Sequence, residues 1–489
     1  MGGFTLISIR KEIKWQQRLL KATTMASLLA LVLGGSGSGW WMPERVGAQS
    51  PAVGKIDDFT AKPIADGSKG SYDLKFEMSP EGKFTAEAKI IVENRSKDEW
   101  DQLIFYFLPN AFTKENKPPF FEDAAEVKIR DVKLDGVKVK YQLTGDTLAI
   151  PLAEKLASNE NREVTVKYAF TVPRKGLRFD RTENGFHLAQ AYPMLATYQG
   201  KDGWNKKPYS LRGESYHTSH ADFSISYRLP KGYTVISSSD QDKASSSQSG
   251  NINVKNTKEV FIAVVKGMRS ISKTVKGVEL RVWGKEADKE AMTVALQAAE
   301  KSFEQFTDKL GPYPHKQLDI LLDETASMEY PGVVTVGHMG SVDPDLSHTV
   351  VHEIAHQWFY GVVSNDPFHH AWLDEGITEL ATTLYFYDVE KKGDASFYFA
   401  EQADATQSVS NLPLDEFGKG PIVGPVYGQP VKELWKLITT YGDATDGWEF
   451  LQAYYQTYAY KQVDTPEFVR FATAYFPVNE QYFAKWLRL

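Results

Sequence analysis

The hydrophobic periodicity of this chain changes part-way along its length, and this change restricts the folds open to it. From about Ser71 to Met268, apolar and polar residues alternate, which is the period of a half-buried strand. Later the spacing becomes helical, first from Glu286 to Leu310 and again from Leu346 onward. A length of 489 residues favours two or three domains. The sequence therefore predicts a multidomain α+β protein, with an N-terminal antiparallel β domain at 55–270 and a mainly helical domain at 271–489.

Shorter segments refine this prediction. The apolar stretches Lys316 to Asp323 and Pro331 to His338 are predicted to be strands that follow the first long helix. The serine-rich segment from Ser237 to Gly250 is predicted to be a hairpin loop between two strands of the β domain.

The first 48 residues have the layout of a targeting segment. Basic residues between Arg10 and Lys21 precede an apolar run from Ala22 to Leu33, and a small-residue cleavage pattern ends at Ala48. The apolar run is shorter than the roughly 20 residues that a membrane helix needs. We therefore expect a signal peptide or signal anchor at 1–48. The protein would then be exported, either secreted or tethered to the outer face of the cytoplasmic membrane of a bacterium.

The composition excludes several classes of function. The chain has no cysteine, so disulfides, thiolate zinc fingers and cysteine nucleophiles are excluded, and any metal must be held by nitrogen and oxygen ligands. The formal net charge of -7 argues against nucleic acid as a partner.

One motif indicates metal chemistry. The segment His352-Glu353-Ile354-Ala355-His356 has the H-E-x-x-H pattern, and on a helix two histidines four positions apart point toward one spot. A zinc ion there would lie roughly 2.0–2.1 Å from each imidazole nitrogen. Glu353 is placed to act as the general base. A catalytic zinc needs a third protein ligand, and two antiparallel helices joined by a loop would bring Glu375 to it.

The sequence around these residues resembles a known family. His352 to Phe359, followed by Trp372 to Gly376, is similar to the gluzincin aminopeptidases, the family that includes aminopeptidase N. The resemblance implies a thermolysin-like catalytic domain and one zinc ion per chain, with Glu375 as the third ligand. It also implies hydrolysis of the N-terminal peptide bond of peptide substrates by metal-activated water.

The same resemblance implies three further site residues. Tyr427 corresponds to the family tyrosine that stabilises the tetrahedral oxyanion, although Gln429 and Pro430 stand where the family usually has Lys-Gly. Glu329 corresponds to the carboxylate that binds the substrate α-ammonium, without the family's flanking glycine and asparagine. Gln190 resembles a β-domain glutamine that assists this carboxylate.

Alternatives to an aminopeptidase remain. The sequence ends soon after Tyr427, so the large C-terminal helical domain of many family members is not expected. A more open cleft would favour a gluzincin endopeptidase, in which Glu329 does not bind an amine. An inactive, membrane-tethered binding protein is a third hypothesis, against which the intact set of ligands, base and tyrosine argues.

Four other polar residues lie near the motif. His348, His369 and His370 are predicted to be peripheral to the metal rather than ligands. Glu379 is predicted either to orient a ligand imidazole or to be a solvated helix charge.

Overall fold

The computed structural model describes residues 58–489 except 120, 122, 240–247, 341–342, 402, 404–408 and 419. The predicted targeting segment at 1–48 lies outside the described residues. Within the described part of the chain, none of the helices combines the length and the apolar character needed to cross a membrane.

The front half of the chain folds into β-sheets whose strands show the predicted alternation. Along β1 and β2, nearly every second side chain is buried while those between are more exposed, so each strand presents one face to a shared core. The largest sheet has the order β16(Ser249–Thr257), β14(Ala221–Arg228), β1(Ser68–Met78), β2(Phe84–Asn94), β8(Asn161–Phe170), β4(Val127–Leu134), β5(Val137–Lys138). Its neighbours pair antiparallel except β1 with β14, which are parallel.

Smaller sheets complete this half. One four-stranded sheet has the order β11(Met194–Leu195), β3(Trp100–Tyr106), β7(Thr147–Leu156), β6(Gln142–Thr144). The other has the order β15(Thr234–Ser237), β17(Ile262–Val265), β10(Gly185–Leu188), β9(Phe179–Arg181), and β12(Thr197–Tyr198) pairs with β13(Trp204–Asn205). Short 3-10 turns span Leu108–Phe112 and Gly200–Asp202.

The predicted hairpin at Ser237 to Gly250 is wrong. The strand before this segment, β15, pairs with β17, whereas the strand after it, β16, pairs with β14 in the seven-stranded sheet. The segment therefore connects two sheets. Its turn-rich composition predicted a loop but carried no information about which strands the loop would join.

The back half has its own sheet and core. The sheet order is β18(Arg269–Val275), β19(Val278–Gly284), β20(Gln317–Asp323), β21(Val333–Gly337), with one antiparallel pair, β18–β19, and two parallel pairs. The helices are α2(Lys289–Lys309), α3(Leu346–Ala355), α4(Ala371–Asp388), α5(Tyr398–Glu401), α6(Gln429–Tyr441), α7(Ala444–Tyr458), α8(Thr465–Tyr475) and α9(Glu480–Phe483). Short 3-10 segments at Glu286–Asp288 and Gly393–Phe397 and a π-helical segment at Val423–Gly428 complete it.

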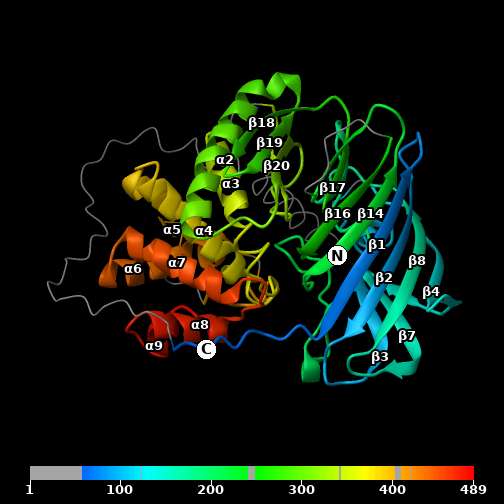
Figure 1. Cartoon of the computed structure of the whole chain (residues 1–489), viewed down its shortest axis with the longest axis horizontal. Coiled ribbons are helices and arrows are strands. Elements are labelled where there is room, and N and C mark those ends of the chain that lie inside the picture. Colours follow the sequence, from blue (N-terminus) through cyan, green and yellow to red (C-terminus); the bar gives the residue numbers. More distant parts are fainter. Residues whose placement is uncertain are drawn as a thin grey trace, which may run out of the picture.

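The two halves lie side by side, with the sheets of the front half on one side of the molecule and the helices, together with β18–β20, on the other (Figure 1). A third apolar cluster joins them, and it includes Phe261 of the β half and Tyr330 of the helical half, whose rings stack at 4.4 Å. Polar contacts cross the same boundary, where His187 Nε2 lies 2.8 Å from Asp323 Oδ2. The segment around Met328 thus runs along the junction of the two halves.

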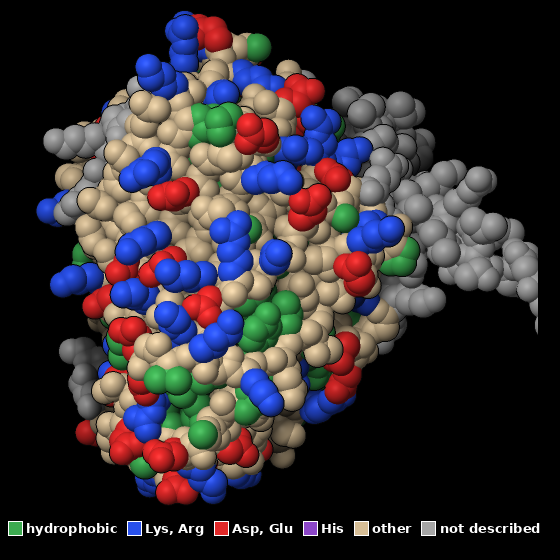
Figure 2. Space-filling model, turned by 90° about the vertical axis from the view of Figure 1, so that its right-hand side faces the viewer, with side chains coloured by type: hydrophobic (Ala, Val, Ile, Leu, Met, Phe, Trp, Pro, Cys, Tyr) green, Lys and Arg blue, Asp and Glu red, His purple; other side chains and the backbone are tan. Residues whose placement is uncertain are grey.

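The outer side of the β half is an ordinary solvated surface. Figure 2 shows lysine, arginine and acidic side chains interspersed there, with apolar side chains only in small groups between them. Lys75 and Glu77 are exposed positions of β1 with opposite charges. Buried charged side chains, by contrast, gather at the junction of the two halves.

Candidate metal centre and active site

Helix α3 carries the two histidines of the H-E-x-x-H pattern at its C-terminal end. His356 is the first residue after α3 but keeps helical dihedral angles, and its N–H donates to the carbonyl of His352 at 3.3 Å. Both imidazoles consequently lie on one face, and their Nε2 atoms are 3.1 Å apart. Two ring nitrogens that face each other this closely require an ion or proton between them.

Helix α4 supplies the third group. It packs on α3 and places Glu375 Oε2 at 3.2 Å from the Nε2 atoms of both His352 and His356. Tetrahedral ligands at ~2.0–2.1 Å from a zinc ion lie roughly 3.3–3.4 Å from each other. The three atoms are thus spaced as a zinc site requires, and two imidazoles with one carboxylate are a donor set that zinc accepts. The structure brings together all three predicted ligands.

Groups behind the imidazoles fix the ring orientations. His352 Nδ1 lies 2.9 Å from Glu379 Oε2, and His356 Nδ1 lies 3.1 Å from Asp374 Oδ1 and 3.1 Å from the Thr378 hydroxyl. With each Nδ1 engaged by an oxygen, each Nε2 faces the metal position. Glu379 is fully buried, so of its two predicted roles the structure shows the one in which it orients an imidazole.

The peripheral histidines lie where the sequence analysis expected. His348 Nε2 is 3.2 Å from the second oxygen of Glu379, which makes it a neighbour of the orienting carboxylate. His369 contacts Asp366, and His370 contacts Thr465, so neither ring faces the candidate ligands.

Glu353 is buried beside the ligands. It is 7% exposed, and its Oε2 atom has no hydrogen-bond partner among the described residues. Burial raises the pKa of Glu353 to about 7, although the positive charges of His352 and His356 act in the opposite direction. A carboxylate with this pKa can both accept and return a proton near neutral pH.

Tyr427 lies over the candidate ligands. It belongs to the π-helical segment Val423–Gly428, and its ring stacks on that of His352 at 5.9 Å. Burial raises the pKa of Tyr427 far above its usual value, and the Glu375 carboxylate raises it further, so the phenol remains a donor. A Cβ at Gly376 would lie 2.9 Å from the Val426 carbonyl oxygen and 2.7 Å from Pro430 Cβ, so glycine lets α4 approach this segment and the start of α6 closely.

Glu329 lies at the junction of the two halves, close to His356. Met328 exchanges backbone hydrogen bonds with Thr335 of β21 at 3.0 and 2.8 Å. These bonds fix the segment that carries Glu329 alongside strand β21. Glu329 is 4% exposed, and its Oε1 atom has no partner among the described residues. Together with His356 and Asp374 it forms a group of ligand-type atoms within 4.8 Å of one another.

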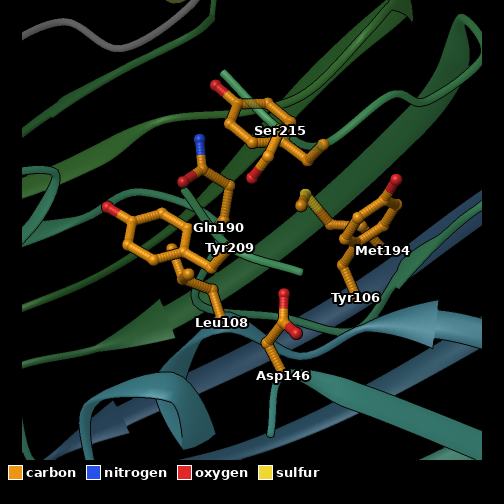
Figure 3. A pocket seen from close by; sticks show the side chains of 8 residues that line it. Tyr106, Leu108, Asp146, Gln190, Met194, Tyr209 and Ser215 are labelled. Carbon is orange, nitrogen blue, oxygen red and sulfur yellow. The ribbon is translucent and has the colours of Figure 1, made fainter. Parts of the chain in front are cut away.

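Gln190 contacts a different residue from the one its resemblance suggested. Its amide nitrogen donates to Glu259 Oε2 at 2.7 Å, and its backbone has a positive φ of 48°. Gln190 also lines a small apolar cavity with Tyr106, Tyr209 and Ser215 (Figure 3). This cavity has room for about one water molecule, too little for a peptide side chain. A role for Gln190 beside Glu329 stays a prediction.

The sequence analysis missed several charged residues at the junction. Glu214 is buried in an ion pair with Arg178, and it acts electrostatically on Glu375 and Glu329. Lys258 and Glu259 are buried nearby. None of these residues belongs to a local motif. These residues stand out because charged side chains are rarely buried, and their burial is known only from the structure.

Comparison with known proteins places this geometry in a family. Residues 294–481 match the peptidase family M1 domain, a segment that contains the three candidate ligands together with Glu353, Glu329 and Tyr427. This segment of the chain is therefore a peptidase family M1 domain. The resemblance to gluzincin aminopeptidases is confirmed by this match.

Three of the curated relatives are aminopeptidases. Aminopeptidase M1-B of Oryza sativa subsp. japonica is 31% identical over 25% of this chain and 16% of its own length. Leucine aminopeptidase 2 of Ajellomyces capsulatus is 25% identical over 52% of this chain and 43% of its own length. Aminopeptidase B of Rattus norvegicus is 25% identical over 41% and 34%. The chain thus spans less than half the length of each of these relatives.

Solved structures share the M1 fold over more of the chain. The M1 zinc metallopeptidase from Deinococcus radiodurans has a TM-score of 0.62 at 17% identity, covering 87% of this chain and 95% of its own. A mutant of that protein bound to a Tyr-Ser-Ala substrate has a TM-score of 0.59 at 16% identity, covering 87% and 98%. The mixed architecture of antiparallel sheets followed by helices is therefore that of an M1 peptidase.

Proposed function

We propose that this protein is a zinc aminopeptidase that hydrolyses the N-terminal peptide bond of peptides. The observation that carries the proposal is the convergence of His352 Nε2, His356 Nε2 and Glu375 Oε2, with Glu353 buried beside them, inside an M1 domain. The zinc cofactor and the substrate-bound state of the Deinococcus radiodurans relative support the metal and the peptide substrate.

The residues of the candidate site have distinct roles in the proposed hydrolysis. A zinc ion held by the two imidazoles and Glu375 would lower the pKa of a water molecule and polarise the scissile carbonyl. Glu353 takes a proton from the attacking water and delivers it to the leaving amine. The Tyr427 hydroxyl donates a hydrogen bond to the oxyanion that develops on the carbonyl oxygen.

Glu329 distinguishes an aminopeptidase from an endopeptidase. Its Oε1 atom is buried without a partner among the described residues; burial and the carboxylates of Glu214 and Asp374 raise the pKa of Glu329, although His356 opposes them. A buried carboxylate of this kind is costly without a cation, and the α-ammonium of a peptide supplies one. The proposal therefore assigns Glu329 as the amine anchor.

The decisive experiment compares a tripeptide with its N-acetylated twin. The aminopeptidase should cleave only the peptide with a free amine, whereas equal cleavage of both would favour the endopeptidase. The control variant Glu353→Gln should lose turnover of either substrate, and unchanged turnover would leave the inactive binding protein as the better hypothesis.

The proposal extends to the organisation and location of the protein. We infer a β domain at 55–270 and a thermolysin-like catalytic domain at 271–489, supported by separate apolar cores on the two sides of this boundary. We further propose export, with or without a membrane tether, from the basic and apolar layout of residues 10–33. N-terminal sequencing of protein recovered from the extracellular and membrane fractions tests this, and an intact cytoplasmic protein would contradict it.

A further inference from the structure

Two adjacent charged residues of the β half are buried at its junction with the M1 domain. Lys258 and Glu259 lie between β16 and β17 and are 3% and 0% exposed. Burying a lysine and a glutamate is costly unless both find partners of opposite charge or hydrogen-bond donors. Their partners therefore indicate what the two side chains hold in place.

The Glu259 carboxylate is fully engaged. Its Oε2 atom accepts from Gln190 at 2.7 Å, and its Oε1 atom accepts from the Tyr216 hydroxyl at 3.1 Å and from the Tyr360 hydroxyl. Two of these donors belong to the β half, whereas Tyr360 belongs to the M1 domain. Glu259 thus ties the loop after helix α3 to the β half.

Lys258 lies over the face of the ring of this tyrosine, Tyr360. Its Nζ atom lies 4.1 Å from the centroid of the Tyr360 ring, and the Thr218 hydroxyl fixes its backbone by donating to its carbonyl at 2.8 Å. Burial lowers the pKa of Lys258, and Asp374 opposes this shift more strongly than Glu259 or Glu329 does. Lys258 and Glu259 therefore hold Tyr360 between them, one at the face of its ring and the other at its hydroxyl.

Tyr360 and Asp374 both adjoin the ligand His356. Tyr360 follows it by four positions, and the two rings meet edge-to-face with centroids 6.5 Å apart. Asp374 Oδ1 lies 3.1 Å from His356 Nδ1. Lys258 and Glu259 thus reach this imidazole through Tyr360, whose ring packs against it.

We propose that the buried pair Lys258 and Glu259 positions the metal ligand His356 from the β half, so that the metal centre is complete only when both halves are packed together. Lys258 lies over the Tyr360 ring and Glu259 accepts its hydroxyl, which together hold this ring against His356 and keep His356 Nε2 directed at the metal. This inference rests on the zinc site of the proposed function and concerns how tightly that site binds zinc.

The experiment measures the zinc dissociation constant of the purified full-length protein by competition with a chromogenic chelator. Lys258→Met should raise the constant by about 10–100-fold, the usual effect of losing a group that orients a ligand. Lys258→Arg keeps the charge and should restore most of the affinity. Glu259→Gln should raise the constant in the same direction as Lys258→Met.

The β half offers a matched control. Lys206 is also a buried lysine, with its side chain 6% exposed, its Nζ atom 2.6 Å from Asp146 Oδ1 and 4.8 Å from the Tyr106 ring centroid. Lys206→Met removes an equivalent buried charge but should leave zinc affinity unchanged. An equal rise in Lys206→Met, or a parent-like constant in Lys258→Met, would overturn the positioning role.

The failure of this inference is separable from that of the proposed function. If the parent protein does not bind one zinc ion that His352→Ala abolishes, both the zinc site and the inference are wrong. If the parent binds zinc and the Lys258 variants bind it equally well, only the inference is wrong. Should Lys258→Met not fold, Lys258→Gln and Glu259→Gln give the same comparison.

Discussion

Replacing His220 with glutamine should make the folded protein less sensitive to acid. His220 is a buried residue just before β14, and its Nε2 atom lies 3.0 Å from the carbonyl oxygen of Gly361 in the M1 domain. Burial lowers the pKa of His220 from 6.5 to about 4, and the positive charges of Lys258, His217 and Lys69 lower it further, although the Gly361 carbonyl acts in the opposite direction. Its neutral form therefore stabilises the fold.

The sign and size of the effect follow from proton linkage. The pKa of His220 is about 6.5 in the unfolded chain and about 4 in the folded protein, so the folded protein takes up this proton only at lower pH. Stability from this residue is thus complete above about pH 6.5 and is lost as the pH falls toward 4. Between pH 7.5 and pH 5 the loss amounts to about 2 kcal/mol for this one group.

The assay is urea unfolding of the parent and of His220→Gln at pH 7.5 and pH 5, followed by fluorescence. Glutamine can donate to the Gly361 carbonyl but cannot take up a proton, so the variant should lose about 2 kcal/mol less than the parent over this pH range. The comparison of two proteins cancels the acid response of every other group. Equal losses in parent and variant would refute the reasoning, because His220 would then titrate alike in both states.

Further predictions concern the metal centre and the core. Tyr427→Phe should lower kcat by about 100–1000-fold with little change in KM, measured by steady-state hydrolysis of an aminoacyl anilide. Glu379→Gln should weaken zinc binding by about 10–100-fold in the chelator competition, because His352 loses its orienting carboxylate. Gly376→Ala should lower activity by displacing the Tyr427 segment from α4, visible as reduced kcat in a protein that still binds zinc. Phe303→Ala, at a fully buried position, should cost about 3–5 kcal/mol in urea unfolding.

Residues of the β half lie beside the candidate active site although they are far from its motif in sequence. Glu259 and Tyr360 are 101 residues apart yet share a hydrogen bond, and Arg178 and Glu214 form a buried ion pair beside Glu329. Local periodicity carries no information on such contacts, because they depend on how two separately formed halves pack together. The strand connection after Ser237 was mispredicted for the same reason.

The sequence by itself determined the parts of this protein that depend on neighbouring residues. The alternation in β1 and β2, the helical spacing of α2 and the four-residue interval between His352 and His356 follow from backbone geometry, which repeats over a few residues. The tertiary structure alone decided which oxygen fixes each imidazole, that Glu329 Oε1 has no partner among the described residues, and that Lys258 lies over the Tyr360 ring. Those relations arise from burial, since a charge in a low-dielectric interior acts on whatever the fold places beside it, however distant in sequence.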